Sequence, residues 1–195
     1  AMKGYFPMEV LDTLRKEGSP LQGHPSMTKC PGIDISTGSL GQGLACAVGM
    51  ALAAKLQNKS YRTYVLTGDG ELGEGINWEA AQTAAKYKLD NLTLIVDNNG
   101  MQSGGSVEEV GGVVNIPGKF AAFGFEVFEV DGHDTSEIMA ALNAPVSGRP
   151  KCIVAHTVKG KGVSFMEHNN AWHKGVPNDE QYATACTELE ALING

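Results

Sequence analysis

The feature that most constrains the fold is a strand, a helix and a strand in succession, with polar residues after each strand. The run RTYVLTGDG at 62–70 is rich in β-branched and aromatic residues and ends in glycine, so it predicts a strand. The run at 75–88 has helical periodicity, and the apolar run at 91–99 predicts a second strand. This order predicts a βαβ unit with two parallel strands.

The rest of the chain continues the alternation. Further strands are expected at 124–130 and at the start of 150–160. Asp134, followed three places later by Glu137, resembles a capping box that opens another helix. Three more helices are expected at 7–16, at about 40–57 and at 179–194. We therefore predict an α/β fold with a parallel sheet covered by helices on both faces.

Composition narrows the class of protein. A chain of 195 residues with 42% hydrophobic content predicts one globular domain over residues 1–195. A net charge of −7 argues against a nucleic-acid or anionic-membrane partner, and no apolar run reaches the roughly 18 residues of a membrane span. The four cysteines form no CxxC pair, which is typical of reduced thiols in the cytoplasm.

Asp69 and Asn99 each stand at the carboxyl end of a predicted strand. Parallel strands of a βαβ unit end on the same edge of the sheet, so the crossover helix brings these two side chains together. Their oxygen atoms suit Mg²⁺ or Ca²⁺. Gly68 and Gly70 leave room for a phosphate, and a helix N-terminus just beyond them favours negative charge. Either motif alone is also an ordinary turn, and their combination is what favours a metal–diphosphate anchor.

The pairing of GDG with NN across one helix resembles the thiamine-diphosphate enzymes. Within them the chain resembles the transketolase family, in particular its separately encoded N-terminal subunit, over essentially its whole length. The resemblance is carried by LQGHPSMTKCPGIDISTGSLGQGLACAVGMALA, GDGELGEGINWEAAQTAAKYKLDNL, IVDNNGMQSGG, VDGHD and HTVKGKGVSFMEHNNAWHKGVPNDEQY. It implies a thiamine-diphosphate-binding fold of the type that holds the cofactor's diphosphate.

The resemblance also implies a ligand set for the cofactor. The divalent ion would be held by the side chains of Asp69 and Asn99 and by the backbone carbonyl of Met101. Gly68 and Gly70 would lie against the diphosphate. Gly38 and Leu40, in TGSLGQG, match the loop that touches the cofactor's aminopyrimidine ring through its backbone.

Three further residues match catalytic positions of the family. His24, in QGHP, matches a histidine near the donor hydroxyls, and His173, in AWHKG, matches one near the diphosphate and the reacting ketose. Glu74 matches a glutamate at the subunit interface, although a surface glutamate in a first helical turn would look the same. His133, in DGHD, is interpreted as structural, and the lysines of KGKG are either solvated or near a phosphate.

The implied activity is transfer of a two-carbon ketol unit from a ketose phosphate to an aldose phosphate, as in the pentose phosphate pathway. It requires a C-terminal, pyrimidine-domain transketolase subunit, in a homodimer or a heterotetramer. The sequence is expected to lack that domain and the family's usual segment before KGYFP. Two alternatives remain: a deoxyxylulose-phosphate synthase-like subunit, or a catalytically silent module that binds a partner.

Overall fold

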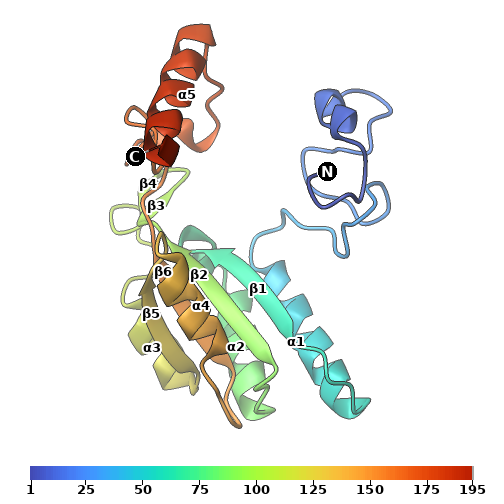
Figure 1. Cartoon of the computed structure of the whole chain (residues 1–195). Helices are drawn as coiled ribbons and strands as arrows, with labels where there is room; N and C mark the ends of the chain where they lie inside the picture. Colours follow the sequence, from blue (N-terminus) through green and yellow to red (C-terminus); the bar gives the residue numbers. More distant parts are fainter. Residues whose placement is uncertain (195) are drawn as a thin grey trace.

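A four-stranded parallel sheet forms the centre of the molecule (Figure 1). The computed structural model describes residues 1–194. The strands lie in the order β1-β2-β6-β5, and all three neighbouring pairs are parallel. Their bounds are β1 Thr63–Gly68, β2 Leu92–Asn98, β5 Glu126–Asp131 and β6 Lys151–His156. Strand β2 is buried over most of its length, as expected for a strand covered on both faces.

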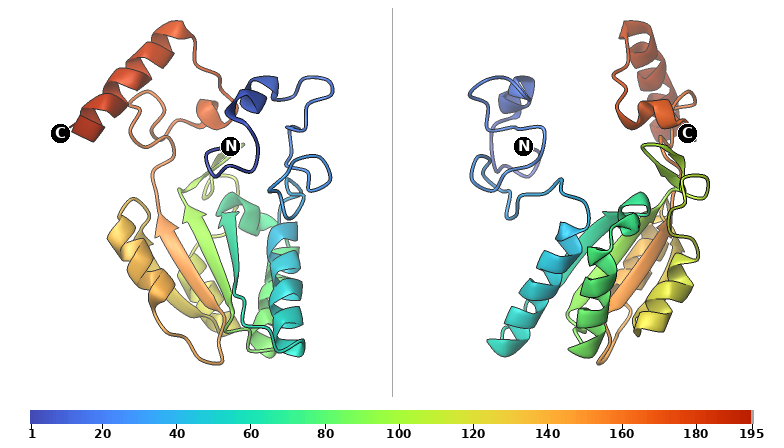
Figure 2. Two further views of the ribbon diagram at one scale, coloured as in Figure 1. Left: turned by 45° about the vertical axis from the view of Figure 1, so that its right-hand side comes forward. Right: turned by 180° about the vertical axis from the view of Figure 1, so that it is seen from behind.

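Four helices cover the two faces of this sheet. One face carries α1 (Gln42–Leu56), α2 (Ile76–Lys86) and α3 (Ile116–Phe123), and the other carries α4 (Thr135–Asn143) (Figure 2). The larger core lies under the first three helices, and a smaller one lies between α4 and strands β5 and β6. The predicted α/β fold with helices on both faces of a parallel sheet is confirmed.

Helix α4 does not extend over β1. It packs on β5 and β6, whereas β1 is the strand at the opposite edge of the sheet. Tyr64 and Leu66 on β1 therefore remain 55% and 67% exposed, whereas their inward neighbours Thr63 and Thr67 are buried. The alternation is that of a strand with one buried and one open face.

The short elements cluster beyond the carboxyl ends of the strands. They are the 3-10 helices η2 (Gly70–Gly73) and η3 (Asn170–His173) and a hairpin of β3 (Met101–Gln102) and β4 (Gly105–Ser106). The N-terminal segment, with the 3-10 helix η1 (Met8–Thr13), and helix α5 (Asp179–Asn194) extend past the same edge (Figure 2). Within residues 1–194, no helix has both the length and the apolar character needed to cross a membrane.

Two local predictions need correction. The segment 7–16 forms the 3-10 helix η1 rather than an α-helix, because none of its residues is buried against the rest of the molecule. Asp134 does cap α4, by accepting hydrogen bonds from the N–H groups of Ser136 and Glu137. The capping box is incomplete, however, because the Glu137 carboxylate accepts from the Asp131 N–H at 2.8 Å instead of reaching back to Asp134.

Candidate functional site

The Asp69 carboxylate joins the ends of β1 and β2. It is 1% exposed, and it accepts hydrogen bonds from the Gly70 N–H at 2.7 Å and from the Gly100 N–H at 2.5 Å. Gly100 lies in the turn that follows β2, so one side chain bridges two loops that are 31 residues apart in sequence. The structure thus brings together the two motifs that the sequence analysis paired.

Asn99 and Met101 complete this turn from the other side. The Asn99 side-chain oxygen accepts a hydrogen bond from the Met101 N–H at 3.0 Å, which makes the turn an Asx-type turn. Met101 then begins β3 and pairs with Ser106. The Asp69 carboxylate and the Asn99 side-chain oxygen therefore both contact the turn around Gly100, and oxygen donors of these kinds fit Mg²⁺.

The charge of Asp69 is only partly compensated by the chain. Burial raises the pKa of its carboxyl above the usual value, and the N–H groups of Gly100 and Gly70 oppose that effect. The negative charge of Asp97 raises the pKa further, and the positive charge of Lys159 lowers it. A buried carboxylate of this kind binds a cation favourably, because the cation restores its ionised form.

The two glycines beside Asp69 differ in their surroundings. A Cβ added at Gly70 would lie 2.6 Å from the Cβ of Gln102, so no side chain fits there. A Cβ added at Gly68 would meet nothing within 4 Å, so the space beside it is open. The helix predicted from residue 75 begins at Ile76, so its N-terminus lies beyond the two glycines as expected, with the single 3-10 turn η2 between them.

A hollow of about 670 Å³ lies on the other side of the β1 end. Its walls include His24, Gly38, Leu40 and Glu71. The His24 ring packs against Gly38, where an added Cβ would lie 2.4 Å from the His24 Cγ. Gly38 also has a φ of +111°, a left-handed value that favours glycine. The structure thus brings His24, Gly38 and Leu40 to one hollow.

Glu74 and His173 lie apart from these groups. Glu74 is exposed and ends η2, two residues before α2. His173 is exposed at the end of η3, which packs beside β3. Within residues 1–194, neither of the two side chains makes a hydrogen bond or an ion pair. Both therefore remain free for contacts outside the described chain.

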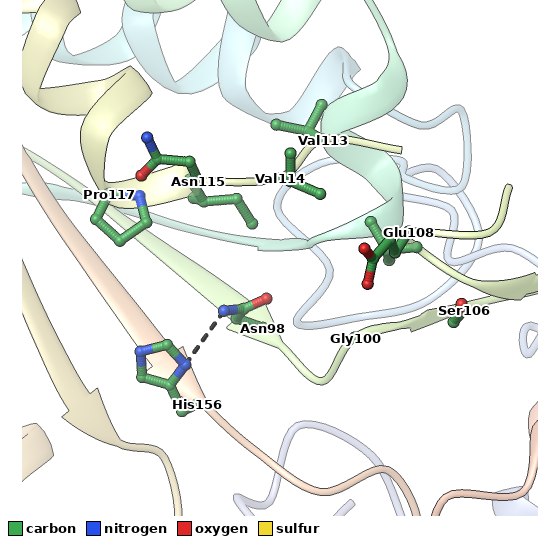
Figure 3. A pocket seen from close by; sticks show the side chains of 11 residues that line it. Asn98, Gly100, Ser106, Glu108, Val113, Val114, Asn115, Pro117 and His156 are labelled. Atoms are coloured by element: carbon green, nitrogen blue, oxygen red, sulfur yellow. Dashed lines mark hydrogen bonds between the residues drawn. The ribbon is translucent and has the colours of Figure 1, made fainter. Parts of the chain in front are cut away.

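Other polar residues at this edge were not anticipated. Thr157 Oγ1 donates a hydrogen bond to Asp97, the single carboxylate of β2. Figure 3 shows a second hollow, of about 410 Å³, where Asn98 Nδ2 lies 3.2 Å from His156 Nδ1. His156 Nε2 also lies 3.1 Å from the Glu129 carboxylate. These contacts join segments that are distant in sequence, so no local sequence motif predicts them.

His133 has a contact of its own. Its Nε2 accepts a hydrogen bond from the Val158 N–H at 2.8 Å, which ties the turn after β5 to the loop after β6. The sequence did not decide the environment of the two lysines of that loop, and the structure now gives a neighbour for each. Lys159 is close enough to Asp69 to lower its pKa, while Lys161 forms an ion pair with Glu167 at 3.7 Å.

A family model named "Transketolase, thiamine diphosphate binding domain" matches residues 1–189. The chain belongs to the transketolase family. It is 45% identical, over 98% of its length and 68% of the relative, to an apulose-4-phosphate transketolase subunit of Phocaeicola vulgatus. It is 43% identical, over 97% of its length and 70% of the relative, to a 6-deoxy-6-sulfo-D-fructose transketolase subunit of Clostridium sp. strain MSTE9.

Solved transketolases have the same fold. The transketolase of Campylobacter jejuni matches 93% of the chain with a TM-score of 0.86 and 39% identity. That of Leishmania mexicana matches 97% with a TM-score of 0.81 and 30% identity. The chain spans only 30% and 34% of those two proteins. The predicted membership of the transketolase family, as a thiamine diphosphate binding unit similar to transketolase subunits, is confirmed.

Proposed function

We propose that this chain is the N-terminal, cofactor-binding subunit of a two-subunit transketolase, which transfers a two-carbon ketol unit from a ketose to an aldose. The observation that carries the proposal is the junction between Asp69 and the Gly100 turn, in a chain of this family. The relatives named as subunits support a separate partner, which would supply the pyrimidine-binding domain. We place the protein in the cytoplasm, and we interpret residues 1–195 as a single diphosphate-binding domain.

The divalent ion, Mg²⁺ or Ca²⁺, would be held by the Asp69 carboxylate, the Asn99 side-chain oxygen and the Met101 carbonyl. The fit is supported by two hard oxygen donors, from Asp69 and Asn99, that contact one turn, and by the burial of the Asp69 carboxylate, which raises its pKa. The ion would in turn hold the diphosphate beside Gly68 and Gly70. When bound, thiamine diphosphate supplies the carbanion chemistry that a ketol transfer requires.

The remaining residues have roles around that anchor. Gly38 and Leu40 would present backbone groups to the aminopyrimidine ring from the wall of the 670 Å³ hollow. His24, packed on Gly38, would face the hydroxyls of the donor sugar. His173 would approach the diphosphate and the ketose from η3, and the exposed Glu74 would contact the partner subunit.

The substrates would be sugars that carry an anionic group. One relative's name specifies apulose-4-phosphate and another's specifies 6-deoxy-6-sulfo-D-fructose, so a phosphate or a sulfonate is the shared feature. This range favours a ketose phosphate or sulfonate donor over a neutral sugar. The sequence relatives include subunits for both kinds of group, so a panel of donors is the direct way to choose between them.

Titration calorimetry tests the anchor. Thiamine diphosphate with Mg²⁺ is titrated into the chain alone and into the chain with a candidate pyrimidine-domain subunit, and binding is expected to tighten with the partner. Replacing Asp69 with Ala should weaken binding at least about tenfold, because the charged ligand of the ion is lost. Unchanged binding by Asp69→Ala would refute the assignment of the anchor.

A further inference from the structure

One carboxylate, that of Glu71, links the two halves of the proposed cofactor site. Its Oε1 accepts a hydrogen bond from the Gly41 N–H at 2.7 Å, and its Oε2 accepts one from the Gly68 N–H at 3.2 Å. Gly41 directly follows Leu40 of the aminopyrimidine loop. Gly68 directly precedes Asp69 of the anchor. The two glycines belong to segments 27 residues apart, and the family resemblance assigned Glu71 no role.

The Gly41 end of this link has little freedom to move. Gly41 is buried with a φ of +82°, and an added Cβ would lie 2.5 Å from the Cγ2 of Ile76. It is the N-cap of α1, whose unpaired N–H groups and positive dipole end attract an anion. Glu71 is the anion that the chain itself supplies at this helix end.

The Glu71 end is also fixed. Its backbone carbonyl accepts a hydrogen bond at 2.7 Å from the side chain of Asn77, which is fully buried at the start of α2. Its side chain lies in the wall of the 670 Å³ hollow. The backbone of Glu71 is therefore fixed by the start of α2, while its carboxylate contacts the start of α1 and the end of β1. A change in either glycine's position would break one of the two bonds.

We propose that Glu71 is a positioning residue that sets the spacing between the aminopyrimidine loop at Gly38 and Leu40 and the metal–diphosphate anchor at Asp69. This inference rests on the proposed function. Thiamine diphosphate has a ring system at one end and a diphosphate at the other, so it must meet both segments at once. Inorganic diphosphate meets only the anchor. Loss of the link should therefore weaken the first ligand and spare the second.

The test compares these two ligands on Glu71→Gln. Glutamine offers one acceptor oxygen in place of two, so one of the two N–H groups loses its partner. We expect the affinity for thiamine diphosphate with Mg²⁺ to fall about tenfold, and the affinity for inorganic diphosphate with Mg²⁺ to stay within about twofold. Glu190→Gln, at an exposed glutamate of α5, is the matched control and should change neither.

The outcomes separate this inference from the proposed function. If Glu71→Gln weakened the binding of both ligands equally, or of neither, the positioning role would be overturned. The assignment of the anchor at Asp69 would not be affected by either result. If the unsubstituted chain bound neither ligand, the proposed function would fail, and the role of Glu71 with it. Should Glu71→Gln not fold, Glu71→Asp keeps both acceptor oxygens on a shorter side chain. The same selective loss of thiamine diphosphate is expected there, and its absence would overturn the inference.

Discussion

Asp69 and Lys151 are both charged, both almost fully buried and both attached to the same sheet, yet their surroundings differ. Lys151 begins β6, and its ammonium donates hydrogen bonds to the carbonyls of Ala141, Leu142 and Ala144 at 2.6–2.8 Å. Those three acceptors match the three protons of an ammonium group. Within residues 1–194, Asp69 accepts hydrogen bonds from two N–H groups, which leaves lone pairs of its carboxylate without a partner.

The difference separates a structural charge from a functional one. Burial lowers the pKa of Lys151 and raises that of Asp69, so both groups are pushed toward their neutral forms. At Lys151 three carbonyls at and just beyond the C-terminal end of α4, where the helix dipole favours a cation, accept hydrogen bonds from the ammonium group. At Asp69 the opposition by two N–H groups is incomplete, and under the proposed function a bound cation would complete it. Saturation by the chain, rather than burial, is the distinguishing property.

The comparison is tested most strongly at Lys151. Replacing it with Met leaves three buried carbonyls without a donor, and we expect the free energy of unfolding to fall by about 3 kcal/mol in urea denaturation. Lys59→Met, at an exposed lysine, is the control and should change stability little. An equally stable Lys151→Met protein would contradict the view that this charge holds α4 to the sheet.

Addition of the ligand is the next largest effect. A ligand that binds only the folded protein stabilises it by about 2.7 kcal/mol at one hundred times its dissociation constant. We expect thiamine diphosphate with Mg²⁺ to raise the thermal midpoint of the unsubstituted chain, and EDTA to reverse that rise. The same ligand should stabilise Lys59→Met equally and Asp69→Asn much less. A rise that persists in EDTA would argue against a metal-held diphosphate.

Asp69→Asn sharpens the contrast with Lys151. The substitution removes a buried charge, but the NH2 group that it introduces faces one of the two N–H donors, so we expect stability to fall by about 1 kcal/mol, less than for Lys151→Met. Affinity for the Mg²⁺ complex should nevertheless fall at least about tenfold, or about 1.4 kcal/mol. A large loss of stability with unchanged affinity would reverse the assignment and make Asp69 the structural charge.

The smallest expected effect lies at the opposite end of α4 from Lys151. Asp134→Ala removes the exposed cap that accepts from Ser136 and Glu137, and such caps contribute about 1 kcal/mol. Denaturation should therefore show a smaller loss than for Lys151→Met. A loss as large as that of Lys151→Met would indicate that helix ends, and not saturation of a buried charge, govern the stability of this helix.

The sequence predicted those parts of the molecule that depend on local pattern. Strands β1 and β2 and helix α2 form within a few residues of the expected ranges, because each has the periodicity of its structure. The approach of Asp69 to the turn after β2 followed from the handedness of one crossover. Helix α1 also formed where expected, even though it contains Gly43 and Gly49.

The parts that were missed depend on contacts between distant segments. Helix α3 escaped prediction because it has only eight residues and includes Pro117 and Gly118, which usually interrupt a helix. The burial of Lys151 cannot be inferred from its type, since lysine is almost always exposed. Glu71 looks like an ordinary surface glutamate until α1 is placed beside it. Each of these features depends on a contact with a residue that is distant in sequence, so the local pattern does not predict it.

The hydrogen bond between Gly100 and Asp69 also has a consequence for folding kinetics. It closes a loop of 31 residues, and the entropy of that closure is offset only after α2 has packed and β1 has paired with β2. The junction is therefore expected to form late in the folding of this unit, after the crossover is complete. Amide hydrogen exchange at Gly100 would report the integrity of the whole crossover from a single proton.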